Sequence, residues 1–166
     1  MTYKDYVKKI FNDNNWTEAA DSLNRIKGKK VLLYTHDDPD GLTSGSLLKR
    51  LVELKGGSVK VFLPDTYELE EKRLRKDLAE DDYSMVILSD KGTMGYYSDY
   101  ASLVDDFLVI DHHPPIGVPA GIHLINPNMK GYNSCSTSFL AHMLMEYHGE
   151  GDLYDDYLSL LGLKGD

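Results

Sequence analysis

VLLYTHDDPDG, residues 31–41, is the stretch of sequence that decides the fold. Its first part, Val31 to Tyr34, is a continuous apolar run, and such runs are typical of a strand covered on both faces. The part that follows, His36 to Gly41, is a polar loop, in which the glycine would let the backbone turn sharply. An apolar strand followed at once by such a loop predicts the repeating units of a mostly parallel sheet.

The rest of the chain alternates short apolar runs with longer amphipathic stretches. Helically spaced leucines follow the loop and are stopped by Gly56 and Gly57. The expected fold class is α/β, a mostly parallel five-stranded sheet with helices on both faces and an extra N-terminal helical extension over residues 1–28. We predict strands at 31–34, 59–63, 85–88, 107–110 and 122–125, and helices at 3–12, 17–27, 47–54, 68–80, 135–147 and 153–163.

The composition describes one globular domain of 166 residues. Lys and Arg number 18 against 27 Asp and Glu, so the net charge is −9 and no overall basic field attracts a polyanion. Cys135 is the only cysteine, which excludes a disulfide framework and a cysteine-based zinc cluster. No apolar run approaches the roughly 18 residues of a membrane span, and a signal peptide is missing. We therefore expect a soluble, cytoplasmic protein.

Three polar clusters each follow an apolar run. In open parallel sheets, ligands bind at the carboxyl edge, where we expect these clusters to meet. Imidazole and carboxylate without thiolate suit Mn²⁺, Mg²⁺ or Zn²⁺, and abundant carboxylate favours the harder ions. One cluster alone is more often a helix cap or a turn, whereas three together predict two metal ions about 3.5–4 Å apart, which activate water for phosphoryl transfer. The clusters are His36-Asp37-Asp38-Pro39-Asp40-Gly41, Ser89-Asp90 and Asp111-His112-His113.

In combination, these motifs resemble the signature of the DHH phosphoesterase superfamily. The triplet Asp111-His112-His113 names that family, and Asp90 matches its lone aspartate after the third strand. The compact form His36-x-Asp38-x-Asp40-Gly41 is closer to RecJ-like exonucleases than to family II pyrophosphatases and nano-RNases, which show His-x-x-x-Asp-x-Asp. Asn126-Pro127, the serine-rich segment 134–138 and the ending Gly162-Leu163-Lys164-Gly165-Asp166 are also similar to segments of these proteins.

The resemblance implies a role for each matched residue. The implied cofactors are two Mn²⁺ or Mg²⁺ ions, with a shared water attacking phosphorus in line. His113 would donate to the scissile phosphate, and Asp111 would support the loop or orient an imidazole. One ion would be held by His36, Asp38 and Asp90, and the other by Asp40, Asp90, His112 and Asp166, with Asp90 bridging the two ions.

Residues 29–166 would form the catalytic DHH domain. Members of the superfamily normally carry a second, smaller substrate-binding domain of the DHHA1 type, and no segment of this chain matches it. A ligand such as Asp166 rarely lies at a natural C-terminus, because termini tend to fray. We therefore expect the chain to be the catalytic part of a longer protein.

Several further residues have both a functional and a structural interpretation. Lys91, beside Asp90, would pair with a phosphate or remain a solvated lysine. Ser134 and Ser136 would offer donors to a phosphate or cap a helix. The tyrosines at 96, 97 and 100 would stack bases of a single strand, although core packing is the commoner role in a chain with 12 tyrosines.

Three functions remain open at this point. The resemblance favours a phosphodiesterase that hydrolyses single-stranded DNA or RNA from an end, in DNA repair and with replication or repair proteins as partners. A small phosphate ester or anhydride (a dinucleotide, 3′-phosphoadenosine 5′-phosphate or pyrophosphate) is an alternative substrate that suits the acidic balance slightly better. The third function is a non-catalytic module similar to the RecJ-related subunit of the eukaryotic replicative helicase, and the retention of every metal-ligand position argues against it.

Overall fold

The central sheet has five strands in the order β2-β1-β3-β4-β5, and every pairing between neighbours is parallel. The computed structural model describes residues 2–165. The predicted α/β class and strand number are confirmed. The strands are β1 (Lys30–Thr35), β2 (Ser58–Phe62), β3 (Tyr83–Ser89), β4 (Asp106–Ile110) and β5 (His123–Ile125).

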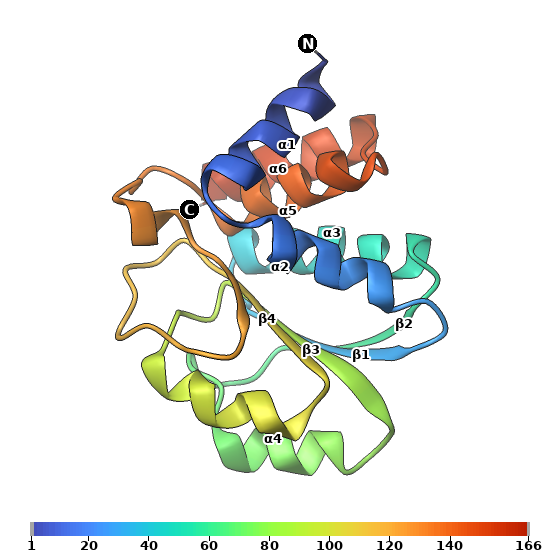
Figure 1. The fold of residues 1–166 in the computed structure, drawn as a ribbon, viewed down its shortest axis with the longest axis vertical. Helices are drawn as coiled ribbons and strands as arrows, with labels where there is room; N and C mark the ends of the chain where they lie inside the picture. Colours follow the sequence, from blue (N-terminus) through green and yellow to red (C-terminus); the bar gives the residue numbers. More distant parts are fainter. Residues whose placement is uncertain (1, 166) are drawn as a thin grey trace.

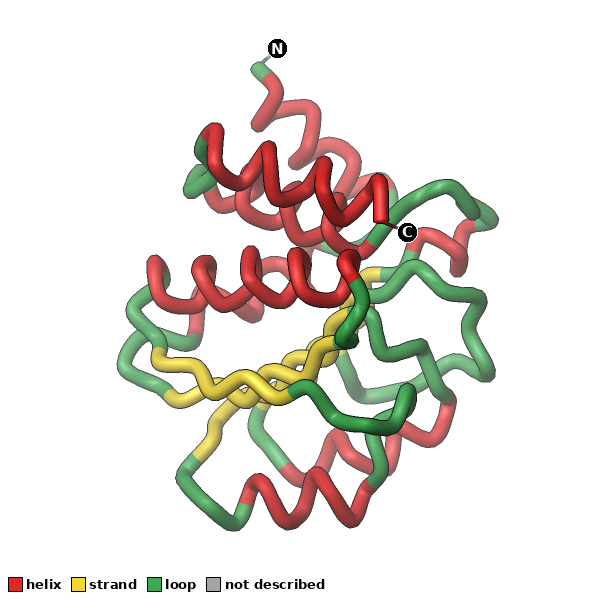
Figure 2. The backbone as a smooth tube through the Cα atoms, turned by 180° about the vertical axis from the view of Figure 1, so that it is seen from behind, coloured by secondary structure: helices red, strands yellow, loops and turns green. Residues whose placement is uncertain are grey.

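Helices cover both faces of the sheet, as Figures 1 and 2 show from opposite sides. On one face lie α1 (Tyr3–Asp13), α2 (Thr17–Ser22), α3 (Pro39–Leu54), α5 (Thr137–His148) and α6 (Leu153–Gly165). The other face carries α4 (Glu71–Leu78) and the 3₁₀ helix η2 (Gly95–Leu103). Two shorter 3₁₀ helices are η1 (Leu23–Arg25) and η3 (Pro127–Lys130). Within residues 2–165, no helix combines the length and the apolar composition that crossing a membrane requires.

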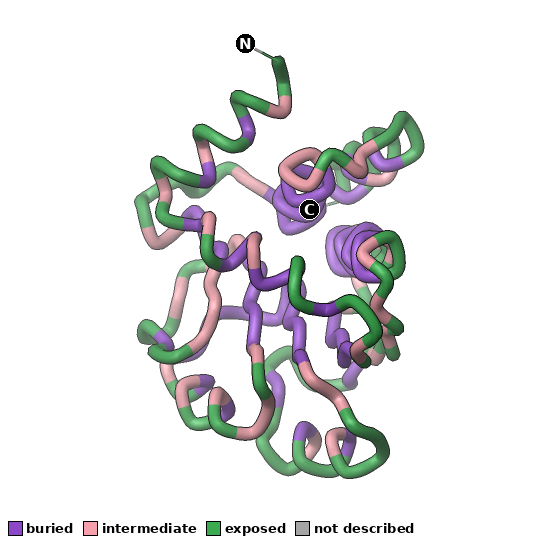
Figure 3. Tube along the Cα trace, turned by 45° about the vertical axis from the view of Figure 1, so that its right-hand side comes forward, coloured by how far each residue is buried: buried purple, intermediate pink, exposed green. Residues whose placement is uncertain are grey.

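Each face of the sheet has its own apolar core, because successive strand residues point to opposite sides. Val31 and Leu33 of β1 pack with α1, α3 and α5, whereas Leu32 and Tyr34 pack with α4 and η2. All four side chains are fully buried. Figure 3 shows that the central strands are buried. Because β1 is covered on both faces, its sequence is an unbroken apolar run rather than an alternation of apolar and polar residues.

The N-terminal helices share the core of the first face. Phe11 of α1 is fully buried, and its ring centroid lies 5.7 Å from that of Trp16 and 5.0 Å from that of Tyr147 on α5. The helix predicted over 17–27 ends earlier, because α2 passes into η1 and Gly28 follows with a φ of +73°. Residues 2–28 are thus packed against α5 rather than set apart from the sheet.

On the opposite face of the sheet, the start of the helix differs most from the one predicted from the sequence. The helix predicted over 68–80 begins only at Glu71, and Leu69 is buried in the preceding loop. Tyr97 of η2 accepts a hydrogen bond from the Leu69 backbone N–H at 3.3 Å, and Tyr100 donates one to the Leu69 carbonyl at 3.1 Å. These long-range contacts pair both backbone groups of Leu69 in the loop that precedes α4.

His148, the last residue of α5, is expected to make the fold acid-sensitive. Burial and the charge of Lys55 lower its pKa to about 4, while its bond to the Ala20 carbonyl, 3.2 Å from Nε2, acts the other way. In the unfolded chain the His148 imidazole takes up a proton near pH 6.5. The contribution of the neutral, buried imidazole to stability is therefore fully present above about pH 6.5 and is lost as the pH falls from there toward 4. Between pH 7 and pH 5, wild type should lose roughly 1–2 kcal/mol more than His148→Gln in urea unfolding. Equal losses in the two proteins would contradict this assignment.

Candidate metal centre at the carboxyl edge of the sheet

The three polar clusters meet because β1, β3 and β4 are adjacent parallel strands. Thr35 pairs with Ser89, and Ser89 pairs with Ile110, so the chain leaves all three strands at one edge. From β1 the chain goes first to β2 on one side and then returns to β3 on the other. The clusters therefore lie at the topological switch point, where ligands bind in open α/β sheets.

Asp90 is the residue that both predicted metal sites share. Its carboxylate is 1% exposed, and its Oδ1 lies 3.5 Å from His112 Nε2 and 3.8 Å from His113 Nδ1. On the other side, its Oδ2 lies 4.0 Å from His36 Nδ1, which is itself 2.8 Å from Asp38 Oδ2. Two groups with metal-ligand spacing result, one of Asp90, His112 and His113 and one of His36, Asp38 and Asp90.

The backbone and charge of Asp90 both suit a site that binds a cation. Its φ of +59° is left-handed, a conformation that costs most residues about 1 kcal/mol and that aspartate tolerates better. Its Oδ2 is buried and accepts no hydrogen bond from the described residues. Burial and the nearby charge of Asp40 raise the pKa of this carboxyl group to about 8. Carboxylates crowded in this way are stabilised by a divalent ion, so the residues present fit the implied metals.

Asp38 combines two roles. Its Oδ1 caps α3 by accepting a 2.8 Å hydrogen bond from the Gly41 backbone N–H. Partial burial opposes ionisation, but this N–H and the His36 imidazole outweigh it, so the pKa of Asp38 is lowered. A carboxylate held ionised beside an imidazole is the form that binds metal.

Asp40, the second residue of α3 and itself a proposed metal ligand, contacts the start of α5. Its Oδ2 accepts a hydrogen bond from the Thr137 N–H at 2.7 Å, and its Oδ1 accepts one from the Ser138 N–H at 2.8 Å. The same Oδ2 is 3.7 Å from His112 Nε2. Asp40 thus joins the loop after β1 to the N-terminus of a helix almost one hundred residues later.

The end of β4 is held by a buried hydrogen-bond network. Asp111 Oδ1 lies 2.8 Å from His113 Nδ1, and its Oδ2 accepts a 2.8 Å hydrogen bond from the Thr93 hydroxyl. Asn126 donates to the Thr93 hydroxyl at 2.9 Å and to the His113 carbonyl at 3.0 Å, and Asn128 donates to the His112 carbonyl. Asp111 is therefore placed to orient an imidazole rather than to face an incoming ligand.

Gly41 is needed because the start of α3 passes close to His36, and not because the backbone turns there. It is the third residue of α3, and a Cβ there would lie 2.5 Å from His36 Cβ and 2.6 Å from the His36 carbonyl carbon. We expect Gly41→Ala to destabilise the domain by about 1–3 kcal/mol, because the loop carrying His36 must move. Urea unfolding measures this loss, and Ser46→Ala on the exposed side of the same helix is the control. Equal stability of the two variants would refute the close-approach argument.

The proposed substrate contacts differ in their surroundings. Lys91 is 1% exposed, and its ammonium donates to the Thr66 carbonyl rather than facing solvent. Ser136 is fully buried and caps α5 by accepting a 3.2 Å hydrogen bond from the Phe139 N–H, whereas Ser134 is exposed. Asp166, the last proposed metal ligand, lies outside the described residues.

Contacts that the sequence motifs did not indicate complete the site. The Thr137 hydroxyl donates to Asp90 Oδ1 at 2.9 Å. The Tyr67 ring lies edge-to-face against both His36 and His113. Thr93 also joins from the loop after β3, and Asn128 joins from η3. These residues come from segments far apart in the chain, so only a three-dimensional arrangement reveals them.

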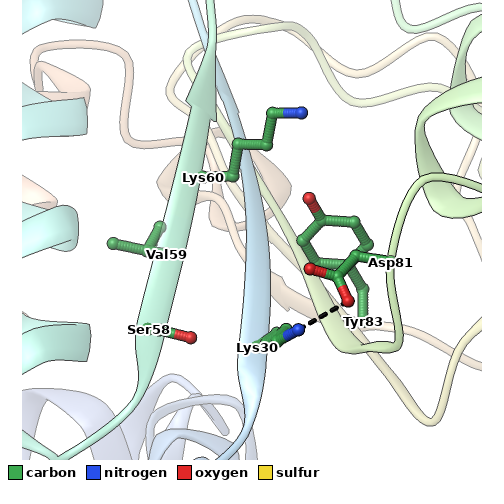
Figure 4. Close-up of a pocket in the computed structure, with 6 residues that line it drawn as sticks. All are labelled: Lys30, Ser58, Val59, Lys60, Asp81 and Tyr83. Atoms are coloured by element: carbon green, nitrogen blue, oxygen red, sulfur yellow. Dashed lines mark hydrogen bonds and ion pairs between the residues drawn. The ribbon is translucent and has the colours of Figure 1, made fainter.

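Two other features of the molecule lie away from this edge. His142, Glu146 and Asp156 form a third group with metal-ligand spacing between α5 and α6. The pocket in Figure 4 lies over the first residues of β1, β2 and β3, the opposite ends of the strands from the site. Lys30 and Asp81 form an ion pair of 2.5 Å in it, and it contains no set of converging imidazoles and carboxylates.

Fold and site together define an α/β domain with a candidate metal centre at its switch point. The sequence profile described as "DHH family, N-terminal domain" matches residues 30–163. The chain belongs to the DHH family. This confirms the resemblance that the strand-end motifs indicated.

Individual relatives support the same fold. The single-stranded-DNA-specific exonuclease RecJ of Bacillus subtilis is 24% identical over 165 residues, covering 88% of this chain and 20% of the relative. A crystal structure of exonuclease RecJ bound to manganese matches with a TM-score of 0.73 at 22% identity, over 87% of this chain and 41% of that one. The structure of CDC45 from Entamoeba histolytica matches with a TM-score of 0.64 at 15% identity, over 98% of this chain and 33% of that one. The chain thus spans about a fifth of the length of the curated relative.

Proposed function

We propose that the chain is the catalytic domain of a metal-dependent phosphodiesterase that hydrolyses single-stranded nucleic acid from an end. The observation that carries this proposal is the position of Asp90, a buried carboxylate shared by two imidazole-containing groups at the switch point. Membership of the DHH family and the similarity to RecJ support the choice of a nucleic-acid substrate.

The proposed cofactors are two Mn²⁺ or Mg²⁺ ions. When bound, such ions supply positive charge to the phosphate and lower the pKa of a bound water toward neutrality. We assign His36, Asp38 and Asp90 to one ion, and Asp40, Asp90, His112 and Asp166 to the other. The binding of manganese in a crystal structure of exonuclease RecJ is consistent with this donor set of carboxylate and imidazole.

The chain's own residues would position the substrate around this centre. Asp111 holds His113 through Nδ1, so that Nε2 is the ring nitrogen proposed to donate to a phosphate oxygen. The Thr137 hydroxyl fixes the rotamer of Asp90, and Asn126 fixes the backbone of His113. Ser134, which is exposed, is the remaining proposed contact to substrate.

The test is hydrolysis of end-labelled single-stranded oligonucleotide with Mn²⁺ by wild type and by Asp90→Asn and His112→Ala. We expect wild type to shorten the strand and both variants to be at least about 100-fold slower, since even residues that only support metal ligands cost 10–100-fold. Equal rates in all three proteins would overturn the proposal. Parallel assays with a dinucleotide, 3′-phosphoadenosine 5′-phosphate and pyrophosphate test the small-substrate alternative, which faster turnover of these compounds would support. Protein that contains no metal and gains no thermal stability from Mn²⁺ would favour a non-catalytic module.

A further inference from the structure

Tyr67 places an aromatic ring in the middle of the candidate centre. It lies in the loop between β2 and α4. Its ring centroid is 5.5 Å from that of His36 and 5.4 Å from that of His113, and both contacts are edge-to-face, at 87° and 80°. Tyr67 therefore bridges the end of β1 and the end of β4. Its side chain stays accessible, with the residue 38% exposed.

The segment after Asp90 also contacts the Tyr67 ring. The Lys91 ammonium lies 5.7 Å from the ring centroid and donates to the carbonyl of Thr66. Gly92 has a φ of +77°, and a Cβ there would lie 3.1 Å from Tyr67 Cε1. The backbone passes this close to the ring only because residue 92 has no side chain.

The loop that carries Tyr67 is anchored by η2. Tyr96 donates to the Glu68 carboxylate at 2.5 Å, and Tyr97 and Tyr100 bond to the backbone of Leu69. Tyr97 and Tyr100 are almost fully buried, so they are not available to stack on a ligand. The tyrosines of η2 instead hold the loop that carries Tyr67, whose ring is accessible to a ligand.

We propose that Tyr67 is a specificity-determining platform on which a nucleobase next to the scissile phosphate stacks, and that Lys91 is the residue that positions it. This inference rests on the proposed function. The carboxylates and imidazoles of the centre are assigned to the metal ions and the phosphate of a substrate, which leaves its planar heterocycle without an assigned contact. An exposed ring held rigidly among them adds that surface, and stacking on it tolerates any base.

The test compares two strands with the same phosphodiester backbone. One is a thymidine hexanucleotide, and the other is a base-free hexamer of tetrahydrofuran phosphate. In Tyr67→Leu we expect the KM for the thymidine strand to rise about 10-fold more than the KM for the base-free strand. A change that both strands share would report the loss of the ring's contacts with His36 and His113. Tyr67→Phe should behave as wild type, and Lys91→Met should raise the same KM. Tyr154→Leu, which removes a tyrosine that is 62% exposed on α6, is the matched control.

A binding measurement tests the platform without turnover. In Tyr67→Trp the new indole should be quenched by thymidine monophosphate but not by inorganic phosphate, with and without Mg²⁺, while the buried Trp16 gives a constant background. Quenching no greater than with phosphate, or equal KM changes for both strands in Tyr67→Leu, would overturn the inference. If wild type hydrolyses neither strand, the proposed function fails, and quenching alone decides the role of Tyr67.

Discussion

Asp90→Asn is expected to lose the proposed Mn²⁺ binding and yet to fold more stably than wild type in the absence of metal. Asp90 belongs to both imidazole-containing groups, so one substitution removes a carboxylate from each. We expect no rise in melting temperature with Mn²⁺ and a loss of strand hydrolysis of at least about 100-fold. Calorimetric Mn²⁺ titration and thermal melts at pH 7.5 measure these effects.

The gain in stability without metal has a separate cause. The Asp90 carboxylate is buried, faces Asp40 and has an oxygen that accepts no hydrogen bond from the described residues. With a pKa of about 8, the folded wild type must either bury this charge or take up a proton near neutral pH, and asparagine avoids both costs. It also keeps a carbonyl oxygen for the Thr137 hydroxyl and tolerates a φ of +59°. We expect a gain of about 1–3 kcal/mol in metal-free urea unfolding.

Asp37→Asn is the matched control for Asp90→Asn. It makes the same chemical change in the same site region, at a side chain that is 79% exposed and outside both proposed ligand sets, with its Oδ1 3.6 Å from His36 Nε2 at the solvent side. It should bind Mn²⁺ as wild type does and change stability by less than about 0.5 kcal/mol. A full Mn²⁺ response in Asp90→Asn would show that Asp90 does not join the two groups.

The fold was predictable because its signals are local. Val31–Tyr34 and Phe107–Ile110 are unbroken apolar runs, and both are strands buried on two faces. Each run is followed at once by its polar cluster. Since the carboxyl ends of neighbouring parallel strands share one edge, the meeting of the clusters followed from the strand order alone.

The parts that sequence could not predict depend on contacts across long stretches of chain. Leu69 has the spacing of a helix residue, yet hydrogen bonds to two tyrosines of η2 keep it in a loop. Lys91 is charged and adjacent to Asp90, so a phosphate contact was reasonable. Its burial beneath Tyr67 depends on a loop more than twenty residues earlier. The periodicity of apolar residues does not predict contacts between segments that are far apart in the chain.

Asp40→Ala is expected to destabilise the metal-free protein by about 2–4 kcal/mol, because the loss of two buried hydrogen bonds exceeds the relief of repulsion toward Asp90. Its two carboxylate oxygens accept the N–H groups of Thr137 and Ser138, the first two residues of α5. Those donors are buried, so alanine leaves both without their acceptors and removes a negative charge from the positive end of a helix. Asp40→Asn keeps one acceptor oxygen and should fall between wild type and Asp40→Ala. Urea unfolding in the presence of a chelator measures each value.

Asp38→Ala separates this structural role from metal binding, because both aspartates are proposed ligands from one loop. Asp38 is partly exposed and accepts one N–H, that of Gly41, as the N-cap of α3. Its loss should cost only about 1 kcal/mol. Both variants should weaken Mn²⁺ binding, but only Asp40→Ala should also loosen the start of α5, which hydrogen exchange at Thr137 and Ser138 detects. Equal costs for the two substitutions would mean that the contact between Asp40 and α5 adds little to the fold, and Asp40 would then act only as a proposed metal ligand.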